Sequence, residues 1–239
     1  DLVLKVFYML FDKGEFYNCL YWIDKIRPEF LNDEKGMWKG RPTKSRRERF
    51  LDRATKALLE CEEYDECIDL CQMALESMDD FINYADTWYR WRIAKSLKAL
   101  NRHEEALGYL TEVLRVKQEW YMYRDMAEIH CSLGNEDEAL KNVCCAMLAP
   151  GQRQMKVNLY GLVHHLLKDS NPDIAMKHAK LYYLLKINTQ ADIDEEIEDL
   201  FIDESEIDGD ALEDEITDFW KDFMFKNQKL QYGTVIQYL

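Results

Sequence analysis

Residues 134–146 read GNEDEALKNVCCA, and residues 101–114 read NRHEEALGYLTEVL. Each stretch begins with a small or polar residue, continues with an acidic pair and Ala-Leu, and then places an apolar residue at every third or fourth position. Apolar residues at that spacing lie on one face of a helix. The sequence therefore predicts the same amphipathic helix twice, with the Gly134 and Asn101 starting points 33 residues apart.

The pattern extends along the chain when each second helix is aligned on its first small residue. The aligned positions are Cys19, Cys67, Ala106, Ala139 and Ala175, at intervals of 48, 39, 33 and 36 residues. Seven residues later stand Ile26, Ala74, Val113, Ala146 and Tyr182, and twelve residues earlier stand Phe7, Thr55, Ala94, Ala127 and Val163. Five residues before each anchor, where one helix must end and the next begin, stand Gly14, Glu62, Asn101, Gly134 and Ser170.

This spacing resembles the tetratricopeptide repeat (TPR) family, whose unit is a helix-turn-helix of about 34 residues. The resemblance covers residues 1–187 and is closest at residues 87–116 and 120–149. It implies an all-α fold, a right-handed α-solenoid of about five TPR-like helical hairpins with a C-terminal capping helix. Tyr182 and Phe7 are larger than the residues that the family places there, which suits terminal copies of a stack.

Composition supports an all-α chain. The 239 residues are 47% hydrophobic and include only 9 Gly and 4 Pro, so few turns are marked and long helices are favoured. Seven cysteines without framework spacing suit a reducing compartment, and no run of about 20 apolar residues is present to cross a bilayer. We expect a soluble, cytoplasmic protein with no membrane partner.

Family geometry implies that the first helices of the hairpins line a concave groove. The groove-facing residues would be Arg49, Asp52, Lys56, Trp88, Trp91, Lys95, Tyr121, Arg124, Glu128, Tyr160 and His164. Aromatic and charged side chains of this kind suit a protein segment, since aromatics supply rigid contact area and cations pair with carboxylates. The alternative is that some of these aromatics pack against neighbouring repeats or the C-terminal tail, leaving no dedicated pocket. A clamp for a C-terminal carboxylate is not expected, because no Asn occupies these positions.

About fourteen residues are additional between the first two copies, compared with the family's unit of about 34. This insertion, residues 28–48, carries a basic patch beside Trp38: Lys39, Arg41, Lys44, Arg46 and Arg47. Such a patch can attract a nucleic-acid backbone or an acidic peptide. It can also be a solvated loop, or pair with the chain's own acidic segment.

That acidic segment, residues 191–218, holds fifteen Asp or Glu and no Lys or Arg, which equals the chain's whole net charge of −15. We expect an acidic linker at 188–209 and an amphipathic capping helix at 210–227, since Leu212, Ile216, Phe219, Trp220 and Phe223 share one helical face. The stretch from Glu204 to Glu215 also approaches calcium-loop spacing, with Gly209 at the sixth position, but Glu replaces the usual first Asp.

The last residues, 228–239, end in GTVIQYL and are rich in strand-favouring side chains. They resemble the opening strand of a cold-shock or S1-like barrel. That resemblance implies a truncated β domain, with a nucleic-acid-binding part beyond residue 239.

Common catalytic motifs are not present: the sequence has no Gly-rich phosphate loop, no G-x-S-x-G, no H-E-x-x-H and no C-x-x-C. His164 and His165 are adjacent, so they point to different faces of a helix and need outside ligands to hold a metal. We therefore expect no enzyme activity, no cofactor and no metal site. The first hypothesis is a protein–protein interaction scaffold that binds a protein segment in the groove, and the alternative is the assembly half of a nucleic-acid-associated protein.

Overall fold

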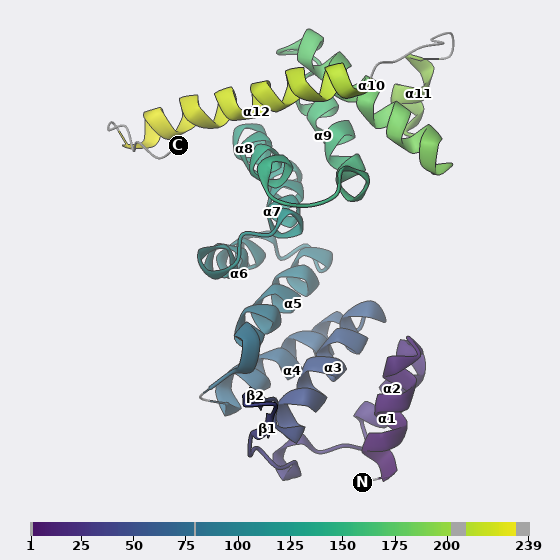
Figure 1. Ribbon diagram of the computed structural model, residues 1–239, viewed down its shortest axis with the longest axis vertical. Coiled ribbons are helices and arrows are strands. Elements are labelled where there is room, and N and C mark those ends of the chain that lie inside the picture. The colour runs from purple at the N-terminus through teal and green to yellow at the C-terminus, as the bar shows by residue number, and fades with distance from the viewer. Residues whose placement is uncertain (1, 79, 202–208, 233–239) are drawn as a thin grey trace. The chain divides into compact units, whose positions relative to one another are not determined.

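The computed structural model describes residues 2–78, 80–201 and 209–232, except for the side chains of residues 210 and 228–232. The contacts divide the chain into two compact units, Asp1–Lys117 (unit 1) and Gln118–Leu239 (unit 2), and each is a set of antiparallel helix pairs (Figure 1). No helix among the described residues is both long enough and apolar enough to cross a bilayer.

Unit 1 contains three helix pairs and the insertion. Its elements are α1 (Leu2–Asp12), α2 (Phe16–Ile23), η1 (Pro28–Phe30), β1 (Gly36–Trp38), β2 (Arg41–Thr43), α3 (Arg46–Glu60), α4 (Tyr64–Ser77), η2 (Ile82–Tyr84), α5 (Ala85–Ala99) and α6 (His103–Val116).

Unit 2 contains two further pairs and the C-terminal helices. Its elements are α7 (Trp120–Ser132), α8 (Glu136–Leu148), η3 (Arg153–Lys156), α9 (Val157–Leu167), α10 (Pro172–Thr189), α11 (Glu195–Asp199) and α12 (Gly209–Tyr232).

The hairpin turns fall at the predicted positions. Gly14, Glu62, Asn101 and Gly134 adopt left-handed φ values of 75°, 63°, 58° and 71°, which turn the chain sharply after each first helix. The fifth turn differs: Asn171 caps α10 by accepting a hydrogen bond from the Ile174 N–H, and Pro172 begins the helix.

The repeat positions form the interior of each unit. All five anchors are at most 1% exposed, and the positions seven residues later and twelve residues earlier are all buried as well. Where Cys replaces Ala at the anchor, the thiol points at the carbonyl twelve residues earlier: Cys19 Sγ lies 3.9 Å from the Phe7 oxygen and Cys67 Sγ 3.3 Å from the Thr55 oxygen. Both thiols therefore act as small interior side chains.

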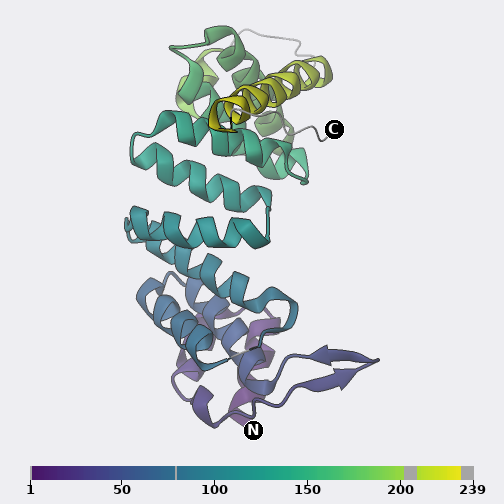
Figure 2. The same ribbon diagram turned by 90° about the vertical axis from the view of Figure 1, so that its left-hand side faces the viewer.

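The insertion differs from the all-helical expectation. Residues 36–43 form a two-stranded antiparallel hairpin with Trp38 opposite Arg41, and it projects from the helices of unit 1 (Figure 2). Lys39 and Gly40 both have positive φ, 49° and 76°, which is the backbone of a two-residue type I′ turn. Ser45 then caps α3 by accepting a hydrogen bond from the Glu48 N–H at 3.0 Å.

The acidic C-terminal region of unit 2 is largely helical in its described part. Helix α12 packs on α8 and α10 (Figure 1), and it buries Ile216 and Trp220. It extends to Tyr232, beyond the expected end at 227 and into the stretch expected to begin a β domain. Within the expected linker, α11 buries Ile197. Residues 204–208 of the calcium-like stretch and the final GTVIQYL motif lie outside the described residues.

Candidate functional site

The outer side of α5 carries a row of aromatic and basic side chains. Trp88, Trp91 and Lys95 follow at steps of three and four residues, so they share one face of the helix, while Ile93, Ala94 and Leu97 face the interior. Tyr84 stands just before α5, and Lys117 lies near both the Tyr84 and the Trp88 rings. Trp88, Trp91 and Lys95 are half-buried, and Tyr84 is 62% exposed. Together with Lys117 we call these residues the α5 face.

Cations flank the rings of the α5 face. The Trp88 and Trp91 rings meet edge to face with centroids 5.8 Å apart. Lys95 Nζ lies 5.0 Å from the Trp91 ring centroid, and Lys117 Nζ lies 4.8 Å from that of Trp88. These distances allow cation–π attraction, which orients both ammonium groups beside a partly open apolar surface. The α5 face can therefore offer aromatic contact and positive charge to one ligand.

Lys117 and Tyr84 are the two members of the α5 face that the groove prediction omitted; Tyr84 lies just before α5, at the end of η2. Lys117 caps the C-terminal end of α6, so it lies outside the helical spacing that selected the other residues. Lys117 directly follows α6, and its Nζ lies near the Trp88 ring at the start of α5. The geometry of a helical hairpin, which brings the end of its second helix close to the start of its first, could have indicated this contact.

Asp52 forms a paired charge cluster beside this face. Its carboxylate accepts hydrogen bonds from Arg92 Nη2 at 2.8 Å and from Lys44 Nζ at 2.7 Å. Burial alone would raise the pKa of Asp52, but Arg92 and Lys44 together outweigh burial and lower it. Arg92 also donates to Thr55 Oγ1 at 3.0 Å. Asp52 and Lys44 therefore contribute to the structure of unit 1 instead of offering open charges.

The predicted groove residues of α3 lie near the aromatic rings of the first pair. Arg49 and Lys56 are exposed, and Lys56 Nζ lies 5.9 Å from the ring centroids of both Phe11 and Phe16. Arg53, which the groove prediction omitted, has its guanidinium carbon 4.8 Å from the Tyr8 ring centroid and pairs with Asp12 at 3.1 Å.

The predicted basic patch separates into two parts. Arg47 holds the insertion together, donating to the carbonyl oxygens of Pro28, Glu29 and Leu31 and pairing with Asp33 at 3.3 Å. Lys39 and Arg41 are exposed on the β1–β2 hairpin, and Arg46 is exposed at the start of α3. The hairpin also exposes Trp38, whose ring centroid lies 5.8 Å from Lys39 Nζ.

In unit 2, the predicted residues of α7 pair largely with one another. Arg124 contacts Asp125 at 3.1 Å and Glu128 at 3.6 Å, and its guanidinium carbon lies 5.5 Å from the Trp120 ring centroid. The Tyr121 ring meets Trp120 edge to face, and burial raises the pKa of Tyr121 to about 12.

Tyr160 and His164 of α9 are not available to an external ligand in the way that the groove prediction required. Tyr160 is 2% exposed, and its ring centroid lies 6.0 Å from that of Trp220 on α12. His164 is 5% exposed, and its Nδ1 lies 3.1 Å from the Ala175 carbonyl oxygen. Trp220 of α12 covers Tyr160, whereas His164 lies against α10 and α11. Helical spacing alone does not show that other helices of the chain fill a groove position.

Comparison with known proteins identifies the family. A family model described as a domain of unknown function, DUF7017, matches residues 87–225, more than half of the chain. The chain belongs to the DUF7017 family. No curated protein matches it in sequence.

The solved structure of another protein has a fold similar to that of this DUF7017 chain. The structure described as "MamA RS-1 ArsTM double mutant" matches with a TM-score of 0.61 and 12% sequence identity, over 80% of this chain and 96% of that one. MamA is a TPR protein, so the likeness confirms the TPR-like fold of stacked helix pairs that the repeat spacing predicted. At this identity the likeness concerns the fold alone.

Proposed function

We propose that this DUF7017-family protein is a non-enzymatic interaction scaffold that binds a protein segment on the α5 face. The observation that carries the proposal is the half-buried Trp88–Trp91 pair with an ammonium group over each ring. TPR-like folds generally present such first-helix faces to protein partners.

The chemistry of the α5 face favours a segment that combines acidic and apolar side chains. Two indole rings give a large rigid contact area at low entropic cost, and Lys95 and Lys117 can each pair with a carboxylate. Next to Lys95, a hollow of about 380 Å³ is lined by Leu59, Glu60, Glu62, Tyr64, Lys98 and Ala99.

The test is selection of peptides followed by direct binding measurement. A random phage-displayed peptide library is selected on the wild-type protein, and the enriched peptides are measured by fluorescence anisotropy. We expect sequences with acidic residues beside aromatic or aliphatic ones. The Trp91→Ala variant should weaken their binding by at least about tenfold, which corresponds to about 1.4 kcal/mol.

A matched control uses an aromatic side chain away from the α5 face. Tyr17 on α2 is 80% exposed, so Tyr17→Ala removes an exposed ring without touching α5 and should leave binding unchanged. Lys117→Ala should weaken binding and reduce its salt dependence. Equal binding to wild type and Trp91→Ala would show that the α5 face is not the site.

A second candidate function is contact with nucleic acid through the β1–β2 hairpin. Trp38 is 69% exposed beside Lys39 and Arg41, and an exposed ring between cations suits a stacked base and a phosphate. Anisotropy of a labelled single-stranded RNA should then fall steeply with salt and be lost in Trp38→Ala. Binding that persists in this variant would exclude the hairpin.

A further inference from the structure

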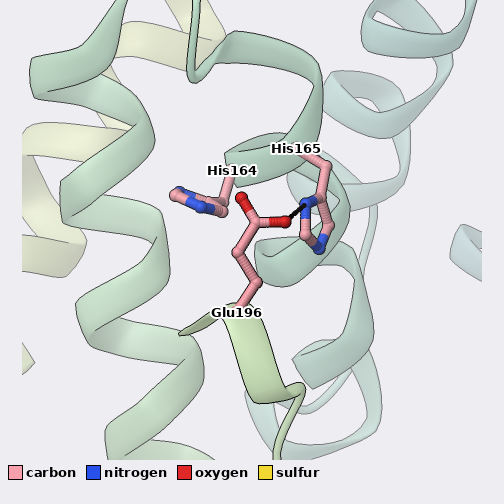
Figure 3. Close-up of side chains that lie close together, drawn as sticks. All are labelled: His164, His165 and Glu196. Atoms are coloured by element: carbon pink, nitrogen blue, oxygen red, sulfur yellow. Dashed lines mark ion pairs between the residues drawn. The ribbon is translucent and has the colours of Figure 1, made fainter. Parts of the chain in front are cut away.

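Two histidines and a glutamate from separate helices converge in unit 2. His164 and His165 are consecutive on α9, and Glu196 lies in α11; Figure 3 shows the Glu196 carboxylate between the two imidazole rings. One ligand atom of each residue lies within 4.8 Å of the others. Among the described residues, no other three His, Cys, Asp or Glu side chains bring their ligand atoms this close together.

The surroundings of His164 leave one ring nitrogen for a ligand. Its Nδ1 lies 3.1 Å from the Ala175 carbonyl oxygen, which can only accept a hydrogen bond. Nδ1 therefore carries a proton, and in a neutral imidazole the Nε2 atom then has the lone pair. Metal-binding histidines usually have this arrangement, with the second nitrogen donating to a carbonyl or carboxylate oxygen.

His165 has a carboxylate oxygen near each of its two ring nitrogens. Its Nδ1 lies 3.7 Å from Glu196 Oε2, and its Nε2 lies 3.6 Å from Asp194 Oδ2. Asp194 is itself fixed, because its Oδ1 caps α11 by accepting hydrogen bonds from the Glu196 and Ile197 N–H groups. The Glu196 carboxylate thus lies between the two imidazole rings, and its Oε2 atom faces Nδ1 of His165.

We propose that His164 Nε2, His165 Nδ1 and Glu196 Oε2 bind a divalent transition-metal ion, with Zn²⁺ as the best-fitting ion. Two imidazoles and a carboxylate form a donor set that zinc uses, and Mg²⁺ and Ca²⁺ prefer oxygen ligands. Bond lengths of about 2.0–2.2 Å require the ligand atoms to approach to roughly 3.3 Å, so the side chains must close on the ion.

Lys168 binds one of the two carboxylate oxygens of Glu196 and leaves the other one facing the histidines. Its Nζ donates to Oε1 at 2.8 Å, so Oε2 remains on the histidine side. A hollow of about 230 Å³, lined by Lys168, Pro172, Ala175, Met176 and Leu200, lies against His164 and Glu196. A fourth ligand of a bound ion would come from this side. Water can be that ligand, giving a four-coordinate ion that joins the acidic α11 to α9.

The sequence predicts no metal site, because adjacent histidines such as His164 and His165 point to different faces of a helix and need a ligand from elsewhere in the chain. Glu196, about thirty residues further along, lies close enough to supply that ligand. The repeat spacing does not reveal it, because α11 lies beyond the repeats.

The test is a titration of the chelator-stripped, full-length protein with Zn²⁺ by calorimetry, and with Co²⁺ by absorption spectroscopy. We expect one equivalent to bind, and the cobalt spectrum should show tetrahedral d–d bands without a thiolate charge-transfer band. Binding only through thiolates, seen as that charge-transfer band, would overturn the proposal, because the chain has seven free cysteines.

Variants locate the site without changing the buried His164. Glu196→Gln and His165→Ala, at partly exposed positions, should each weaken Zn²⁺ binding by at least about tenfold. Glu195→Gln, at the neighbouring exposed position of α11, is the matched control and should bind as the wild type does.

Lys168→Met provides a test in the opposite direction. Removing the ammonium group from Glu196 should strengthen Zn²⁺ binding, whereas a purely structural ion pair predicts no gain. Wild-type affinity in both Glu196→Gln and His165→Ala, or unchanged affinity in Lys168→Met, would overturn the proposed site.

Discussion

At the scale of single residues, the turn between α3 and α4 shows how a repeat position constrains the backbone. Glu62 has a φ of 63°, the conformation that Gly14 and Gly134 adopt in the equivalent turns. A side chain with a Cβ atom costs about 1 kcal/mol or more in this region, whereas glycine does not. The repeat geometry therefore imposes a small strain where the sequence lacks glycine.

Replacing Glu62 by Gly should stabilise unit 1 by up to about 1 kcal/mol, because the left-handed turn no longer carries a Cβ atom. Urea unfolding followed by circular dichroism at 222 nm measures the change. Glu66→Gly, in the first turn of α4, is the control and should be destabilising, since helical backbone there disfavours glycine. Destabilisation by Glu62→Gly would contradict the assigned turn.

At the scale of elements, the interface of α12 is mainly apolar and includes a buried hydrogen bond between Trp220 and His178. Trp220 Nε1 donates to His178 Nε2 at 2.9 Å, and His178 Nδ1 donates to the Ile174 carbonyl oxygen at 2.8 Å. His178 is fully buried, and burial lowers its pKa to about 4. Both ring nitrogens are satisfied in the neutral form, so protonation would remove the acceptor that holds Trp220.

The pH dependence of unit 2 follows from this contact. Between about pH 6.5 and pH 4 the unfolded chain binds a proton at His178 and the folded chain does not, so stability should fall as pH decreases through that window. The loss should be on the order of 3 kcal/mol at pH 4. Thermal melts of wild type and His178→Gln at several pH values measure it, and an equal slope in both would contradict the assignment.

The tryptophan side of the contact has its own test. Trp220→Phe keeps most of the apolar contact and removes the N–H donor, leaving His178 Nε2 unsatisfied, so unit 2 should lose about 1–3 kcal/mol. Phe219→Leu, a neighbouring change on the same helix without a hydrogen-bond donor, is the control for packing. Denaturant midpoints of the two variants should differ, with Trp220→Phe the lower.

At the scale of the whole molecule, negative charge is concentrated in unit 2, and some of the acidic side chains there form ion pairs. Glu213 pairs with Arg153, Glu215 with Lys177 at 2.8 Å, and Glu196 with Lys168 at 2.8 Å. These pairs are partly exposed, so solvent and salt screen their attraction and they add little to stability. Ile216 and Trp220, which are almost fully buried, contribute more to docking of α12.

Deletion of residues 191–239 should therefore destabilise unit 2 much more than 0.5 M NaCl does. The deletion uncovers Tyr160 and His178, whereas salt only screens exposed pairs. Size-exclusion chromatography should show association of the truncated chain, and its melting temperature should fall. A larger effect of salt than of truncation would mean that electrostatics, not apolar burial, holds the cap.

The helix pairs, their turns and their interior positions follow from the spacing of residues along the chain. Each hairpin depends on the spacing of residues that are close in the chain. Cys67, Ala106 and Ala139 are small and buried because neighbouring helices approach closely at these positions. An apolar face on residues 212–223 also sufficed to predict α12, since such a face must be buried.

Which groove positions stay accessible depends on packing between distant parts of the chain. Helical spacing placed Tyr160 and Trp91 in equivalent positions, yet α12 buries Tyr160 while Trp91 remains half-exposed. The same packing pairs Asp52 with Arg92 and brings Glu196 close to His164 and His165. These contacts join residues about 30 to 60 positions apart, and periodicity describes only which face a side chain occupies, not what later packs against it.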